Sequence, residues 1–298
     1  MTTKKKTAKK SGKAAPAKKP AAKKTTAKES VKKPAVKEAP AKKPAEQKSD
    51  PDHAIIADYN GYDYKKIFWE DGKRDYEDLC DRLAVRKLLP DTMDDFVDIA
   101  GGYGRLTDEY ISRAKHSTIF DYSKTELADA KKTYGDRIMT KEGDIYNLPF
   151  ENETFDGLMM VRATHHFKDM PKVVEELYRV MKPGGVAVIE IASKKTLPKM
   201  FRYWFKKSDI NPFSKEPSYL KELEMYNYHP KYMEDLFKKQ GFKILKVLSV
   251  SNFRSPKLKR VFGTKVLGKM EKVAQPTLAP IRFAPSIYYK LEKTPKNA

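Results

Sequence analysis

Along residues 93–250, short runs that are apolar on both faces alternate with longer segments whose apolar residues have helical spacing. The run FDGLMMV (155–161) is typical of a buried strand in a parallel sheet. The segment PKVVEELYRVM (171–181) has helical spacing with a proline at its start, and VAVIEIA (186–192) is again an apolar strand. Because strands alternate with helices, the pattern predicts a doubly wound, mostly parallel α/β sheet.

The same alternation continues on both sides of this unit. Residues 96–99 predict a first strand, which is followed by a glycine-rich turn and by a helix that begins at residues 106–111. A second strand ends at Asp121, and the helix after it is closed by Gly135. Further elements are predicted as a third strand in RIMTKEGD (137–144), a helix in HPKYMEDLFKKQ (229–240) that precedes a sixth strand, and a last, edge strand in PSIYYKLEKT (285–294).

Other stretches flank or interrupt these elements. The segment 53–92 is rich in aromatic residues and contains one amphipathic helix that ends at Pro90. We therefore predict a tail (1–52), an N-terminal cap or lid segment (53–92), a core (93–195) and a completion of that core (196–298). The last part includes substrate-side insertions at about 196–228 and 251–284.

The tail differs from the rest of the chain in composition. Lys, Ala, Pro and Thr recur there without an aromatic residue, which predicts a disordered segment. Residues 1–49 contain 17 Lys and three Glu, so they carry +14 of the net charge of +21 and leave a moderately basic remainder. The tail resembles those of linker-histone-like proteins. Two roles are open for residues 1–50, a nonspecific contact with nucleic acid or another polyanion, and an aid to solubility.

Several protein classes are excluded by composition. Cys80 is the only cysteine, so there is no internal disulfide framework and no zinc site with two thiolates from one chain. No apolar run has the length of a transmembrane helix, and the N-terminus lacks the apolar block of a secretory signal. We therefore expect a soluble, cytoplasmic protein.

The glycine-rich turn DIAGGYGR (98–105) carries the strongest functional signal. Its small residues let the backbone approach a ligand closely, and the N-terminus of a following helix favours electronegative groups. Asp121 lies 23 residues after Asp98 at the end of the second strand, and Asp144 lies 23 residues after Asp121 at the end of the third. Carboxylates at these positions can accept hydrogen bonds from ribose hydroxyls and from an adenine amino group. The three acidic residues predict a pocket for an adenosine that carries a charged group.

The motifs DIAGGYGR, FDYS, GDIYNLPF, FDGLMMVRATHHF and LYRVMKPGGVAVIE resemble those of class I S-adenosylmethionine (SAM)-dependent methyltransferases, especially the type 11 quinone and small-molecule group, over residues 96–192. The resemblance implies a Rossmann-like sheet of seven strands, mostly parallel with an antiparallel last strand, SAM as co-substrate and no metal. Ala100 stands where the family has its first glycine. The cofactor-binding residues it implies are Asp98, Ala100, Gly101, Gly102 and Gly104 around the methionine portion, Asp121 and Tyr122 at the ribose, Asp144 and Ile145 at the adenine, and Val161 beneath the sulfonium.

A nicotinamide site is the competing interpretation of the glycine-rich turn. That fingerprint requires G-x-G-x-x-G, whereas Gly102 and Gly104 are followed by Leu106 and Thr107. The spacing therefore favours the methyltransferase.

The acceptor side is less determined. The methyl group of SAM is already activated, so a dedicated catalytic residue is optional and none is assigned. His166, as a base, and Arg162, as a ligand for an acceptor carboxylate or phosphate, are candidates after the fourth strand. The alternatives are that the histidine flanks a helix and that Arg162 forms a structural ion pair.

The aromatic insertion 196–228 favours a small-molecule, lipid-like or quinone-like acceptor, and its basic residues are compatible with an anionic membrane surface. Two further functions stay open: a nucleic-acid-associated methyltransferase, and an inactive SAM-binding scaffold that uses the basic tail.

Overall fold

The computed structural model describes residues 64–70, 74–221 and 223–295. The predicted tail and residues 53–63 of the predicted cap segment lie outside the described residues. All the described residues belong to one unit of the chain, Lys43–Ala298.

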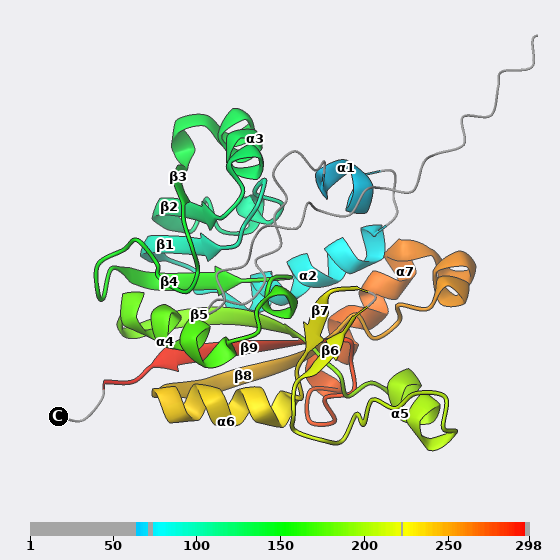
Figure 1. The fold of residues 1–298 in the computed structure, drawn as a ribbon. Coiled ribbons are helices and arrows are strands. Elements are labelled where there is room, and N and C mark those ends of the chain that lie inside the picture. Colours follow the sequence, from blue (N-terminus) through cyan, green and yellow to red (C-terminus); the bar gives the residue numbers. More distant parts are fainter. Residues whose placement is uncertain (1–63, 71–73, 222, 296–298) are drawn as a thin grey trace, which may run out of the picture. The chain divides into compact units, whose positions relative to one another are not determined.

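A seven-stranded sheet forms the centre of this unit (Figure 1). The strand order is β3-β2-β1-β4-β5-β9-β8. The strands from β1 to β5 pair in parallel, and β9 is antiparallel to both of its neighbours. The predicted doubly wound sheet with an antiparallel last strand is therefore confirmed. The strands are β1 (Met93–Ile99), β2 (Ala114–Asp121), β3 (Met139–Glu142), β4 (Phe155–Met160), β5 (Met181–Ala192), β8 (Phe242–Val250) and β9 (Ser286–Lys293).

The prediction that residues 285–294 form an edge strand is wrong, because β9 lies between β5 and β8. Successive residues of a strand point to opposite faces of a sheet. Tyr288 and Tyr289 are both fully buried, so both faces of β9 are covered, as expected for an interior strand. The edge of the sheet on this side is β8.

Helices cover both faces of the sheet (Figure 1). On one face, α4 and α6 pack in an apolar core that includes Ile189. On the other face, α2 and α7 pack in a second core that includes Val188 and Cys80. Among the described residues, no helix is both long and apolar enough to cross a membrane. The helices of the two layers and of the β2–β3 connection are α2 (Asp75–Leu88), α3 (Lys124–Tyr134), α4 (Met170–Val180), α6 (Pro230–Gln240) and α7 (Pro256–Thr277).

The segment between the glycine-rich turn and β2 differs from the prediction. Residues 106–111 form turns and a short 3-10 helix (Thr107–Glu109) in place of the predicted helix. Gly102 and Gly104 have φ values of +53° and +79°, which a right-handed helix does not allow. Only residues 105–113 then remain before β2 begins. The turn therefore lacks the expected helix N-terminus, and its N–H groups are satisfied in another way, described below.

The two insertions begin at the same end of the sheet, where β5 and β8 have their carboxyl ends. The first follows β5 and contains α5 (Leu197–Trp204) and the antiparallel pair β6 (Ser218–Leu220) and β7 (Met225–Asn227). The second follows β8 and contains α7. Because β5 and β8 are both antiparallel to β9, they run in the same direction, and their carboxyl ends lie at the same end of the sheet. A short helix, α1 (Tyr64–Phe68), precedes α2.

Candidate active site

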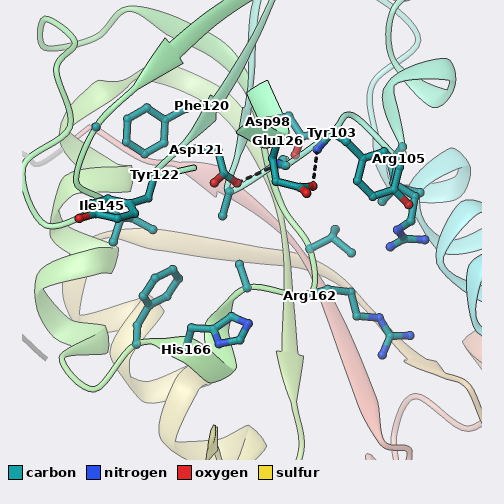
Figure 2. A pocket seen from close by; sticks show the side chains of 18 residues that line it. Asp98, Tyr103, Arg105, Phe120, Asp121, Tyr122, Glu126, Ile145, Arg162 and His166 are labelled. Carbon is teal, nitrogen blue, oxygen red and sulfur yellow. Dashed lines mark hydrogen bonds between the residues drawn. The ribbon is translucent and has the colours of Figure 1, made fainter. Parts of the chain in front are cut away.

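A pocket of about 970 Å³, counting the space open to solvent, lies at the carboxyl ends of β1, β2 and β4 (Figure 2). In open α/β sheets, ligands bind at this edge where the strand order reverses. Here β1 lies between β2 and β4, so the reversal occurs beside β1.

Most of the residues predicted to bind the cofactor line this pocket. Gly104 and Asp144 are the exceptions. The Asp144 carboxylate accepts a hydrogen bond from the N–H of Tyr146 at 2.9 Å, within its own loop. The Gly104 carbonyl accepts one from the hydroxyl of Tyr134 at 3.3 Å. The predicted residues that do line the pocket are Asp98, Ala100, Gly101, Gly102, Asp121, Tyr122, Ile145 and Val161, together with the acceptor-side candidates Arg162 and His166.

The glycine-rich turn wraps its backbone around two carboxylates. The Gly102 N–H donates to Oδ2 of Asp121 at 2.9 Å. A Cβ atom at Gly101 would lie 2.8 Å from Cγ of Asp98, so a side chain at this position would displace the buried Asp98. Ala100 has a φ of +54°, a conformation that favours glycine, and therefore retains strain of about 1 kcal/mol. The substitution in the family's motif thus has a local cost in conformational energy.

Two of the pocket carboxylates are destabilised as anions. Asp98 is 3% exposed, and burial raises its pKa to about 7, against the opposing effects of the Tyr110 hydroxyl and Arg105. Burial also raises the pKa of Asp121, although this carboxylate accepts hydrogen bonds from Gly102 and Ser123. Both groups would be stabilised by a ligand that brings hydroxyl donors or positive charge.

Glu126 supplies a third carboxylate, which the sequence analysis missed. Ser123 begins α3 and its side chain accepts from the Glu126 N–H, so S-x-x-E has the spacing of a capping box. In such a box the glutamate would accept from the Ser123 N–H, but here Asp121 Oδ1 does so at 2.8 Å. Glu126 instead accepts from the N–H of Tyr103 at 3.2 Å (Figure 2). Asp121 and Glu126 thereby accept hydrogen bonds from the N–H groups of Gly102 and Tyr103 in the turn. The N–H groups in the first turn of a helix have no partner within that helix, so they would need such acceptors too.

Arg162 lies at the pocket wall, but its side chain is held in the protein interior. Its Nε and Nη2 atoms donate to the two carboxylate oxygens of Asp81, each at 3.0 Å. Its backbone N–H donates to Glu190 at 3.0 Å. In Figure 2 the guanidinium points away from His166. This geometry favours the structural ion pair over a role as an acceptor ligand.

Asp81 connects four separate parts of the fold. Besides Arg162 after β4, Asp81 on α2 pairs with Arg105 of the glycine-rich turn at 3.0 Å and accepts from the Tyr288 hydroxyl of β9 at 2.7 Å. Asp81 is fully buried; burial would raise its pKa, but the two guanidinium groups lower it overall. The guanidinium carbon of Arg105 lies 3.8 Å from the ring centre of Trp69. These contacts fix the rear wall of the pocket.

His166 belongs to a 3-10 helix (Thr164–His166) after β4 and lines the pocket. Burial lowers its pKa to about 4, so the imidazole is neutral at pH 7. The ring centre of His165 lies 4.0 Å from that of His166. A neutral ring in this position can accept a hydrogen bond, but it is a weak base.

Comparisons with known proteins agree with this geometry. Residues 97–189 match the type 11 family model described as a methyltransferase domain. The demethylmenaquinone methyltransferase of Desulfitobacterium hafniense is 32% identical, over 36% of this chain and 46% of that protein. The 2-methyl-6-phytyl-1,4-hydroquinone methyltransferase 2 of Oryza sativa is 33% identical, over 30% of this chain and 27% of that protein. The chain spans about half or less of the length of these curated relatives.

Solved structures match over a larger part of the chain. A SAM-dependent methyltransferase of Thermotoga maritima has a TM-score of 0.51 and 20% identity, over 77% of this chain and 98% of that one. An S-adenosylmethionine-dependent methyltransferase of Mesorhizobium loti has a TM-score of 0.50 and 17% identity, over 70% and 95%. The fold is that of the class I SAM-dependent methyltransferases. The residues that match the methyltransferase-domain model, 97–189, lie within this fold.

The pocket residues fit SAM, the co-substrate of this family. When bound, SAM supplies an activated methyl group on a sulfonium. It carries hydroxyl donors and positive charge, which would stabilise the buried Asp98 and the partly buried Asp121 as anions. In the part of the chain that the structure describes, no three His, Cys, Asp or Glu side chains are grouped to hold a metal ion.

Proposed function

We propose that this protein transfers the methyl group of SAM to a small, quinone-like acceptor. The methyltransferase domain and the class I fold support the reaction type. The acceptor class is supported by the relatives, whose names specify demethylmenaquinone and a phytyl hydroquinone as substrates. These matches cover between 27% and 58% of each relative, so the acceptor is inferred from the shared domain alone.

The observation that supports this proposal most directly is the pair of carboxylates at adjacent strand ends, the buried Asp98 of β1 and the partly buried Asp121 of β2. In the proposal Asp121, with Tyr122 beside it, accepts from the ribose hydroxyls, because its oxygens already face the glycine-rich turn. Asp98 and the turn formed by residues 100–104 surround the cationic methionine portion. Ile145 flanks the adenine, with Asp144 next to it but outside the pocket lining, and Val161 lies beneath the sulfonium.

The acceptor side of the proposal follows from the position of β4. His166 and Arg162 follow this strand and both line the pocket, but the Arg162 guanidinium is paired with Asp81. His166 is our candidate to accept a hydrogen bond or a proton from an acceptor hydroxyl. We further propose that residues 53–92 cap the core (93–195) and that insertions in 196–298 shape the acceptor pocket. The contact between Trp69 and Arg105 supports the capping role.

Calorimetric titration with SAM and S-adenosylhomocysteine tests the cofactor part. We expect Asp121→Ala to weaken both by about tenfold or more, because two charge-assisted hydrogen bonds are lost. Asp121→Asn keeps one acceptor oxygen and the shape of the side chain, so it separates the effect of the lost charge from an effect on folding. Asp136→Ala, with a fully exposed side chain, is the matched control. No binding of either ligand to the wild-type protein would refute the proposal and favour a scaffold whose cofactor site has decayed.

Transfer of a labelled methyl group to short-chain demethylmenaquinol tests the acceptor part. Transfer RNA and duplex DNA serve as competing acceptors. Labelled quinol is the expected product. SAM binding together with label only in nucleic acid would overturn the acceptor class while leaving the cofactor site in place.

A further inference from the structure

Helix α5 exposes its apolar face. Its side chains Leu197, Phe201 and Trp204, with Phe205 at its C-terminal end, are 50%, 51%, 57% and 69% exposed. Their spacing of four, three and one residues places them on one side of the helix. The only buried side chain of the helix is Met200. A soluble surface helix normally shows the reverse arrangement, with its apolar face inward.

Aromatic contacts hold this face together. The ring centres of Phe201 and Trp204 are 5.7 Å apart, and Trp204 stacks on Phe213 at 5.9 Å. Phe213 is itself 41% exposed. The result is a continuous apolar surface, which we call the α5 aromatic face (Leu197, Phe201, Trp204, Phe205 and Phe213). Exposed patches of this kind mark interaction sites.

Positive charge surrounds this face. Arg202, Lys206 and Lys207 are exposed beside the aromatic residues. They form no ion pair within the described residues. Asp209 is the one exposed acidic residue between positions 195 and 215. The occupant of the face therefore combines apolar groups with negative charge.

A second helix at the same edge of the sheet repeats the combination. On α7, beyond the kink at Gly263, the exposed residues Val266, Met270 and Val273 follow helical spacing. The exposed cations of α7 are Lys257, Arg260, Lys265, Lys269 and Lys272, whereas the only acidic residue of this helix, Glu271, is buried. Figure 1 shows α5 and α7 at the same end of the sheet.

We propose that the α5 aromatic face, with the cationic stripe of α7, binds the surface of an anionic lipid bilayer. Aromatic side chains inserted at the headgroup level and flanking Lys and Arg are the features of interfacial membrane binding. Nucleic acid would bind the cations and stack its bases on the aromatic rings, but it offers no apolar environment in which Val266, Met270 and Val273 would be buried. The proposal does not depend on methyl transfer. It places the membrane at the edge of the sheet where the pocket opens.

Trp204 is a built-in probe for the test, since the chain has only two tryptophans. In the full-length Trp69→Phe variant, Trp204 emission is recorded with vesicles of phosphatidylcholine alone and of an equimolar mixture with phosphatidylglycerol. We expect a blue shift with the anionic vesicles and quenching by brominated phosphatidylcholine included in them. Binding without quenching would mean adsorption through other basic segments, and it would overturn the proposal.

Vesicle sedimentation of surface variants separates apolar from ionic contributions. We expect Phe201→Ser/Phe205→Ser to weaken partitioning by at least about tenfold, since each lost apolar contact weakens it severalfold. Met139→Ser is the matched control, because Met139 is 56% exposed and lies at the start of β3, the outermost strand on the side of the sheet away from β8. Lys206→Glu/Lys207→Glu should weaken binding by at least about thirtyfold, and Lys238→Glu/Lys239→Glu at the end of α6 much less.

Other occupants give distinct results. If Trp204 is shielded from acrylamide before vesicles are added, the chain itself covers the face. If light scattering shows a dimer that Phe201→Ser/Phe205→Ser converts to a monomer, a second copy covers it. If the emission responds to a single-stranded oligonucleotide and not to vesicles, the partner is nucleic acid. Each of these outcomes would refute the proposal.

Discussion

The buried Asp98 carboxylate should make the protein without ligand less stable at neutral pH than its amide variant. Asp98 is 3% exposed and lines the pocket beside the glycine-rich turn. The Tyr110 hydroxyl donates to it at 3.2 Å, a contact that the oxygen of an asparagine can also accept. We therefore choose Asp98→Asn, which removes the charge and keeps the shape.

The sign follows from proton linkage. Burial raises the pKa of Asp98 from 3.8 to about 7, so the folded chain binds this proton more tightly than the unfolded chain. The contribution to stability is fully present below about pH 3.8 and is lost as the pH rises to about 7. The full loss is about 4 kcal/mol, at roughly 1.4 kcal/mol per pH unit. An amide nitrogen without an acceptor costs about 1–2 kcal/mol, so the expected net gain for Asp98→Asn at pH 8 is about 2 kcal/mol.

Thermal and urea unfolding at pH 5 and pH 8 measures this difference. A gain of about 2 kcal/mol corresponds to a rise of roughly 4–8 °C in the melting temperature. The advantage of Asp98→Asn should be smaller at pH 5 by about 2–3 kcal/mol. The same variant should show a smaller stabilisation by added SAM. An equal effect at the two pH values, or a loss of stability at both, would refute the reasoning, and Asp136→Asn controls for the removed charge.

Two further substitutions test the frame of the site. Asp81→Ala leaves Arg162 and Arg105 buried without their shared carboxylate, and we expect urea unfolding to show a loss of about 3–5 kcal/mol. The exposed Asp94→Ala should cost less than about 1 kcal/mol, and equal losses would contradict the role given to Asp81. Ala100→Gly should raise the free energy of unfolding by about 0.5–1 kcal/mol through relief of the positive φ, and a destabilised variant would argue against that strain.

Local signals in the sequence determined most of the elements around the pocket. Ser123 caps α3 and Gly135 ends it, and Pro171 lies in the first turn of α4, all within a few residues of the predicted boundaries. Gly241 ends α6 in the left-handed conformation. Such signals act between neighbours in the chain, so they can be recognised without the fold. The regular spacing of strand ends likewise predicted that Asp98 and Asp121 lie close together.

Only the tertiary structure decided the contacts between distant segments. Nothing in the local sequence indicates that Asp81 bonds Arg162 or Tyr288, which lie 81 and 207 residues further along the chain. The interior position of β9 depends on its two partners and not on its own apolar pattern, which is compatible with either position. The helix expected after the glycine-rich turn is absent because Gly102 and Gly104 take positive φ and the turn's N–H groups find two carboxylates instead. Burial, which sets the pKa of Asp98 and the ion pairs of Arg162, is a property of the assembled chain.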